Sequence, residues 1–281
     1  MTLTAFLFVL LLVAVSAVAG LIGSIMGLGG GIIVIPFLTL VLGVPIRLAL
    51  GASIVSVIAT SSGAASSYVA DRLTNLRVGM FLELGTTAGA VTGALLAGLV
   101  PTRGLYLLFG LLLIYSACSL FQRRQQELPA PVEPDRFSRR LNLQGEYYDQ
   151  ALGQRVSYRA TRALPALATM YGAGIASGLL GIGSGVFKVL AMDGLMRLPM
   201  KVSTATSNFM IGVTAAASAG VYFARGDVNP ILAGPVALGV LLGARAGAHL
   251  MTRLRNTLLR KAFIPILLYV AIQMFLRGIR G

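Results

Sequence analysis

The sequence predicts an all-α polytopic membrane protein made of two repeats, each with four to five membrane helices. Three observations predict this fold class. The 281 residues are 56% hydrophobic and only 11% charged, whereas a soluble protein carries about 25% charged residues. Long apolar runs recur along nearly the whole chain, and the second half of the chain aligns with the first.

The apolar runs come first, because a helix needs about 20 apolar residues to cross a bilayer. Most runs reach that length, but runs 32–44 and 186–196 are too short to span comfortably, so whether they cross fully stays open. In chain order the runs are 4–26, 32–44, 48–70, 78–100, 104–121, 163–180, 186–196, 203–224, 230–250 and 257–276.

The first run imitates a secretory signal peptide, but it lacks the basic segment that precedes the apolar core of such peptides. It also has a counterpart deep inside the chain. We therefore expect residues 4–26 to form a retained membrane helix.

The charged residues indicate topology and not a nucleic-acid partner. The net charge is +14, and most Lys and Arg residues lie at the ends of apolar runs, where they orient membrane helices. Cys118 and His249 are the single cysteine and the single histidine, so a disulfide within the chain and a Cys- or His-based zinc site are excluded. We expect neither a metal nor another cofactor.

A shift of 154 residues superimposes one half of the chain on the other without a gap. The register holds for a hundred residues, which chance matches would not achieve, and it divides the chain into a first membrane repeat (1–121) and a second (163–281). Matching residues include Pro45 with Pro199, Ser53 with Ser207, Thr60 with Thr214, Tyr68 with Tyr222, Asn75 with Asn229, and Gly27, Gly29 and Gly31 with Gly181, Gly183 and Gly185.

Residues 122–162 form the one sizeable polar segment between the repeats. The segment contains three prolines and charges of both signs, and no helical or strand period persists in it. We expect a cytoplasmic linker, either a loop or a short amphipathic element. A ligand-sensing role is the less favoured alternative.

The positive-inside rule chooses between parallel and inverted repeats. If each half crosses four times, 13 Lys and Arg residues share a side with the linker and 8 do not. If the glycine segments are turns between two membrane elements, each half has five elements and the repeats are inverted. The division is then 16 against 5, so inverted repeats are favoured.

Two glycine-rich segments occupy equivalent positions, "GLGGG" at 27–31 and "GIGSG" at 181–185, each before a short apolar run. Transporters built from inverted repeats bind substrate at helices that are broken in both halves. Helix N-termini attract anions, so the paired breaks predict a site for a small anion. The alternative is that the glycines are tight turns that let helices pack closely. The candidate substrate-binding residues here are Gly29, Gly30, Gly31, Gly183, Ser184 and Gly185.

Further polar side chains follow the breaks in sequence. Lys188 lies three residues after Gly185, and an ionisable residue in an apolar segment is a functional candidate by default. It could hold the anion or carry a coupling proton; snorkelling or pairing with Asp193 is an equally weighted alternative. Ser53, Ser207 and Asn208 could donate to the substrate, although helix–helix hydrogen bonding is the commoner role for such groups.

Glu83 and Arg245 are the remaining deep charges, in a coupling or structural role. In an inverted arrangement they lie at matching depth, so we expect them to approach each other. Gly85, Gly89 and Gly93, together with their copies 239, 243 and 247, form small-residue ridges that favour close helix packing.

The duplicated glycine segment, Pro45 and Pro199, and "KVSTATSNFMIGVTAAAS" (201–218) resemble the sulfite exporter TauE/SafE family, also called the toluene sulfonate uptake permease family. The resemblance covers essentially the whole chain apart from 122–162. It implies an inner-membrane transporter, more often an exporter, for sulfite, sulfoacetate, thiosulfate or a related organosulfonate. Ser184 stands where the first half has Gly30, so the two halves of the site are not equivalent.

The absence of an ATPase motif makes transport secondary, coupled to protons through Glu83 and Lys188 or to sodium. The expected partners are the anion and the lipid bilayer, and a homodimer is compatible with the sequence. An anion channel and a membrane scaffold without transport remain alternatives. A membrane enzyme is disfavoured, because few polar groups lie within the apolar runs.

Overall fold

The computed structural model describes residues 2–122, 132–254 and 256–280. The first half contains α1 (Thr2–Met26), α2 (Gly31–Pro36), the π-helical segment η1 (Phe37–Val41), α3 (Ile46–Ala70), α4 (Leu76–Ala97) and α5 (Thr102–Gln122). The second half contains α7 (Ala163–Leu180), α8 (Gly185–Leu190), η2 (Ala191–Leu195), α9 (Met200–Ala224), α10 (Pro230–Met251) and α11 (Asn256–Arg280). Between the halves lie α6 (Arg136–Arg140), β1 (Gly145–Asp149) and β2 (Gln154–Tyr158).

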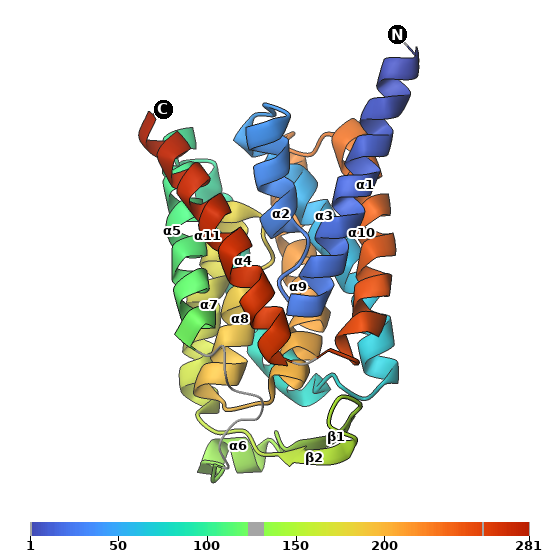
Figure 1. Ribbon diagram of the computed structural model, residues 1–281. Coiled ribbons are helices and arrows are strands. Elements are labelled where there is room, and N and C mark those ends of the chain that lie inside the picture. Colours follow the sequence, from blue (N-terminus) through green and yellow to red (C-terminus); the bar gives the residue numbers. More distant parts are fainter. Residues whose placement is uncertain (1, 123–131, 255, 281) are drawn as a thin grey trace.

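The helices stand side by side in one bundle, and α6, β1 and β2 lie across one end of it (Figure 1). Both marked ends of the chain lie at the opposite end. The most extensive helix pairs join the two halves: α1 packs on α10, α4 on α7, α5 on α11 and α3 on α9. The halves are therefore interleaved and do not form two separate bundles.

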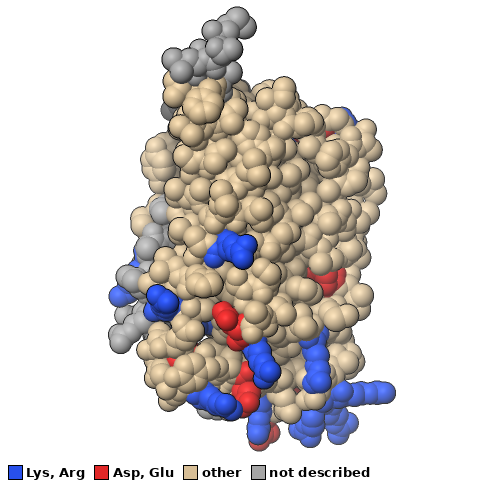
Figure 2. Space-filling model, turned by 90° about the vertical axis from the view of Figure 1, so that its right-hand side faces the viewer, with Lys and Arg blue, Asp and Glu red and all other residues tan. Residues whose placement is uncertain are grey.

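Within the described residues, five helices are long and apolar enough to cross a membrane, namely α1 from Phe6 onward, α3, α4, α7 and α10. Figure 2 shows Lys and Arg gathered toward the end of the bundle that carries the strands, whereas most of the remaining visible surface is uncharged. This is the distribution that the apolar runs and the charge count predict for a polytopic membrane protein.

Equivalent positions 154 residues apart start the helices in the same way. Pro45 and Pro199 directly precede α3 and α9. The Asn75 Oδ1 accepts a hydrogen bond from the N–H of Val78 at 3.1 Å, and the Asn229 Oδ1 accepts one from Ile231 at 2.9 Å. These asparagine caps satisfy N–H groups that the first turn of a helix leaves unpaired.

The glycine ridges allow backbone-to-backbone packing between the halves. A Cβ at Gly89 of α4 would collide with the carbonyl oxygen of Tyr171 on α7, and a Cβ at Gly243 of α10 would collide with that of Ala17 on α1. These two contacts are equivalent under the 154-residue shift, which relates Gly89 to Gly243 and Ala17 to Tyr171. The small side chains are thus explained by helix packing.

The segment between the halves corrects the expectation of a loop or short amphipathic element, because it also contains an antiparallel hairpin. The hairpin is anchored by a buried ion pair between Lys201 at the start of α9 and Asp149 at the end of β1, with Nζ and Oδ1 2.7 Å apart. Tyr158 of β2 accepts a hydrogen bond from Asn75. Each strand has five residues, too few for a period to be recognised in the sequence.

Candidate functional site

Both glycine-rich segments interrupt the helical backbone directly after the first long helix of each half. The helical backbone stops at Met26 and resumes at Gly31, and it stops again at Leu180 and resumes at Gly185. The first interruption has φ of 70° at Gly27 and 77° at Gly29. The second has φ of 61°, 73° and 55° at residues 181, 183 and 184. Positive φ is readily adopted by glycine, which explains why glycine is repeated there.

The two interruptions lie against each other, and each accepts a hydrogen bond from a helix of the opposite half. The Ser53 hydroxyl donates to the Gly181 carbonyl at 2.7 Å, and the Ser207 hydroxyl donates to the Gly27 carbonyl at 2.6 Å. The two bonds are equivalent under the 154-residue shift. Each half of the chain therefore holds the broken segment of the other half in place.

The predicted glycines line this contact from both sides. A Cβ at Gly29 would touch Val57 and Ile211, and a Cβ at Gly183 would crowd the same two side chains. A Cβ at Gly31 would collide with the Ser53 hydroxyl, and one at Gly185 with the Gly27 carbonyl oxygen. These four glycines therefore lie around one contact between the two interruptions.

The two interruptions differ at the fourth residue. The Gly30 N–H donates to the Thr60 Oγ1 at 3.1 Å. Ser184, at the matching position, is fully buried, and its hydroxyl donates to the Gly183 carbonyl at 2.7 Å. The Thr214 hydroxyl, which matches Thr60, has different partners.

Asn208 lies beside the first interruption and is fully buried. Its Nδ2 donates to the Ser24 carbonyl at 2.7 Å and to the Thr204 carbonyl at 3.1 Å. Its Oδ1 accepts no hydrogen bond from the described residues. The three polar side chains predicted to contact substrate, Ser53, Ser207 and Asn208, thus all donate to backbone carbonyls here, which is the alternative role named for them.

A buried ion pair stands beside the second interruption. The Lys188 Nζ lies 3.1 Å from the Glu83 Oε2, and the side chain of Lys188 is fully buried. Thr214 of α9 lies between the two charges, because its hydroxyl contacts Lys188 and donates to the Glu83 Oε1. Thr86 and Thr87, one turn along α4, donate to the two carboxylate oxygens at 2.9 and 3.0 Å.

This cluster corrects the expected approach of Glu83 to Arg245. The partner of Glu83 is Lys188, whereas Arg245 is exposed on α10. Lys188 also departs from the alternatives of snorkelling and of pairing with Asp193, because its ammonium is buried against α4 and α9. The expectation was based on depth along two helices, and depth does not determine which way a side chain faces.

The threonines around Glu83 were not singled out from the sequence. The repeat alignment shows Thr214 only as the match of Thr60, and it gives no role to Thr86 or Thr87. A signal was present, since residues three and four positions after Glu83 share its face of a helix. Hydroxyls at those positions are well placed to solvate a buried carboxylate.

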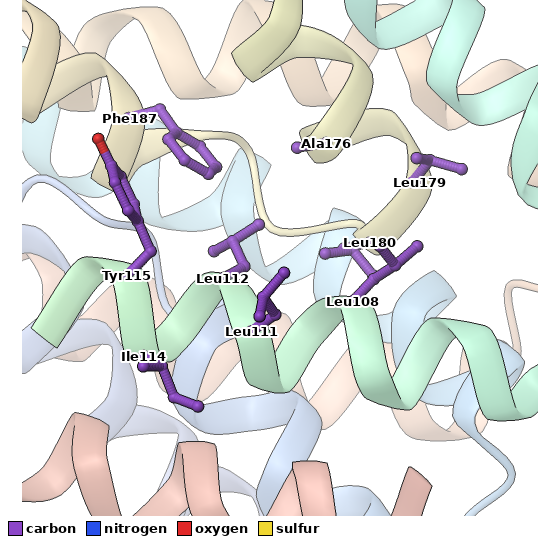
Figure 3. A pocket seen from close by; sticks show the side chains of 9 residues that line it. All are labelled: Leu108, Leu111, Leu112, Ile114, Tyr115, Ala176, Leu179, Leu180 and Phe187. Atoms are coloured by element: carbon purple, nitrogen blue, oxygen red, sulfur yellow. The ribbon is translucent and has the colours of Figure 1, made fainter.

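An apolar pocket of about 520 Å³ lies between α5 and the α7–α8 segment, beside the second interruption (Figure 3). The rings of Tyr115 and Phe187 stack at its edge with centroids 6.1 Å apart. Its walls offer little for an anion to bind, so it is distinct from the polar cluster. The lining residues are Leu108, Leu111, Leu112, Ile114, Tyr115, Ala176, Leu179, Leu180 and Phe187.

Interleaved membrane helices, paired interruptions at equivalent positions and a buried ion pair beside one of them are features of multi-pass membrane transporters. The sequence profile of the sulfite exporter TauE/SafE family matches residues 12–274. The chain therefore belongs to the sulfite exporter TauE/SafE family, whose members are transporters and not enzymes. A multi-pass location in the cell inner membrane, as predicted, agrees with this membership.

Curated relatives match along almost their whole lengths. The chain is 26% identical to the probable membrane transporter protein YunE of Bacillus subtilis (strain 168) over 276 residues, which is 96% of this chain and 98% of the relative. It is 26% identical to the probable membrane transporter protein YdhB of the same strain over 255 residues, 90% of this chain and 94% of the relative. It is 29% identical to the probable membrane transporter protein ORF9 of Sinorhizobium sp over 276 residues, 98% of this chain and 92% of the relative. No solved structure matches the chain.

Proposed function

We propose that this chain is a secondary transporter that exports a small sulfur-containing anion: sulfite, sulfoacetate, thiosulfate or a related organosulfonate. The observation that carries the proposal is the meeting of the two helix interruptions, each of which accepts a serine hydrogen bond from the opposite half, from Ser53 of α3 or Ser207 of α9. The family description as a sulfite exporter supports the substrate class and the direction.

In this proposal the two halves are inverted repeats. α1 starts at the end of the bundle that carries both chain ends, whereas α7 starts at the end that carries the strands (Figure 1). Contacts between α1 and α10 recur between α7 and α4 at equivalent residues. Opposite directions combined with equivalent contacts are what a pseudo-two-fold axis in the membrane plane requires. The loops at 71–77 and 197–201, with the segment 122–162, would then face the cytoplasm.

The anion would bind where the two interruptions meet. Irregular backbone at membrane depth is tolerated only where it is buried in protein or lines a wet cavity, and its N–H groups can bind an anion. Lys188 provides the positive charge. Because Ser184 and Lys188 have no polar counterparts in the first half, where Gly30 and Val34 occur, the second interruption would carry more of the specificity.

Binding and transport are tested with the purified protein and in proteoliposomes. We expect at least one of sulfite, thiosulfate and sulfoacetate to raise the melting temperature, and unlabelled anion on the far side to accelerate uptake of labelled anion. Large currents without such acceleration would favour an anion channel. Stabilisation by none of the sulfur anions would contradict the proposed substrate class.

A pair of glycine substitutions separates the site from the general packing of the bundle. In Gly183→Ala the new methyl group would crowd Val57, and the backbone would be strained because alanine rarely adopts the φ of 73° found at this position. We therefore expect transport to fall at least tenfold. Gly172→Ala on α7 is the matched control, because a Cβ there meets no atom within 4 Å. Transport is measured as anion flux per inserted protein. Equal flux from both variants would contradict the placement of the site at the interruptions, and flux from the unaltered protein no higher than that of empty liposomes would favour a scaffold without transport.

A further inference from the structure

The ionised cluster beside the second interruption is built from both halves and has no counterpart beside the first interruption. The positions equivalent to Lys188, Glu83 and Thr86 are Val34, Ala237 and Val240, which are all apolar. The repeat itself therefore does not require these charges. A buried ion pair is a costly feature that is better explained by function than by stability.

Both carboxylate oxygens of Glu83 accept hydrogen bonds from protein groups. Thr86 and Lys188 bind Oε2, while Thr87 and Thr214 bind Oε1. A threonine hydroxyl can rotate and accept as well as donate. The same hydroxyls could therefore solvate a protonated Glu83, so the surroundings of this side chain accommodate both of its charge states.

The neighbouring elements supply few other charges. α7 contributes none, and on η2 the ionisable group is Asp193, which is buried. Lys201 at the start of α9 is paired with Asp149 of the hairpin. An incoming anion would therefore disturb the charge balance between Glu83 and Lys188. Asp193, on the η2 segment that directly follows α8, is a further carboxyl group nearby in the chain.

On the basis of the proposed function, we propose that anion binding and proton uptake are coupled at this pair: Lys188 exchanges Glu83 for the anion, and Glu83 takes up one proton. Lys188 lies in the first turn after Ser184, whose carbonyl accepts its N–H at 3.0 Å, so its side chain starts beside the second interruption. The anion and the proton would therefore occupy the protein together.

The proton limits the charge that is buried in this exchange. Before binding, the carboxylate and the ammonium cancel. On binding, the ammonium pairs with the anion, and a proton from solution converts the carboxylate of Glu83 to an uncharged carboxyl group. For a singly charged sulfonate the three groups then sum to zero. For thiosulfate or sulfoacetate, which carry two negative charges at neutral pH, they sum to −1, a charge that the backbone N–H groups of the interruptions can stabilise. Without the proton, each sum would be more negative by one charge in a low-dielectric interior, which is strongly disfavoured.

The test measures protons and anions together. Thiosulfate and sulfoacetate serve as probes, because neither titrates near neutral pH. Calorimetric titrations in buffers of different ionisation enthalpy should show uptake of about one proton per anion bound, and by linkage the affinity should fall about tenfold for each unit of pH increase. Binding of either anion without proton uptake would overturn this inference and leave the proposed function intact, whereas binding of neither of them, nor of sulfite, would overturn both.

A variant identifies the group that takes up the proton. Glu83→Gln keeps the shape and the threonine contacts but cannot titrate, so anion binding should persist without proton uptake and without the pH dependence. Glu146→Gln, at an exposed carboxylate of the hairpin, is the matched control and should behave as the unaltered protein. Proton uptake that survives in folded Glu83→Gln would contradict the assignment. The measurement on the unaltered protein decides the coupling even if this variant does not fold.

Discussion

At the residue scale, the ion pair of Lys188 and Glu83 is a polar contact whose loss should have a large energetic consequence. Both charges have left water, and the cost of that transfer is offset by their mutual attraction and by the surrounding threonines. Removing one partner leaves the other charge buried without compensation. Removing both leaves only neutral groups, so single and double substitutions have different effects on stability.

We expect Lys188→Met to lower the free energy of unfolding by about 3–5 kcal/mol, because it strands the Glu83 carboxylate. The double variant Lys188→Met with Glu83→Gln should recover most of that loss, since no charge is then buried. Melting temperatures of the purified proteins measure both effects. Anion binding should be absent from both variants, because each lacks the ammonium.

A double variant that is as unstable as the single one would show that Lys188 stabilises the protein through packing of its stem and not through charge. A double variant that still binds thiosulfate would remove Lys188 from the proposed site. The two outcomes are separable, because one is read from melting and the other from binding.

At the element scale, the interruptions show what the sequence could and could not predict. The 154-residue shift placed Gly27–Gly31 and Gly181–Gly185 at equivalent positions, and the helices stop there. It could not predict that Ser53 and Ser207 donate to the carbonyls of the opposite interruption, because that depends on how the halves dock. For the same reason the predicted partner of Glu83, Arg245, was wrong. The strands of the hairpin could not be predicted because each is too short for its period to be recognised.

We expect Ser53→Ala to destabilise the protein by about 1–3 kcal/mol, because the buried Gly181 carbonyl would lose its donor. Ser207→Ala should cost a similar amount by equivalence. Ser62→Ala is the control: Ser62 is exposed on the same helix as Ser53 and bonds within that helix, so its loss should stay within about 0.5 kcal/mol. Thermal unfolding compares the three variants, and equal losses at Ser53 and Ser62 would contradict a special role for the cross-half bond.

At the scale of the whole molecule, the positive charges and the hairpin occupy the same end of the bundle (Figures 1 and 2). The hairpin is fastened there to both halves, through Asn75 before α4 and through Lys201 at the start of α9. The composition of the chain predicted the membrane bundle. Neither the composition nor the positions of Lys and Arg predicted that the connecting segment is a folded part of that end.

The topology makes a prediction about the accessibility of two exposed leucines. Leu99 follows α4 at the end away from the hairpin and is 81% exposed, while Leu152 lies in the hairpin turn and is 40% exposed. In a Cys118→Ser background, a membrane-impermeant maleimide should label Leu99→Cys in intact spheroplasts. Leu152→Cys should be labelled only after the membrane is permeabilised. The reverse pattern would place the positive end outside and contradict the assigned orientation.

The reciprocal serine bonds also have a consequence for how the protein is made in the cell. Ser53 leaves the ribosome long before its acceptor, Gly181, has been synthesised, and the Gly27 carbonyl waits still longer for Ser207. The first 121 residues thus enter the membrane before the hydrogen-bond donor of the Gly27 carbonyl exists. The native contact between the two interruptions can therefore form only after translation has passed Ser207.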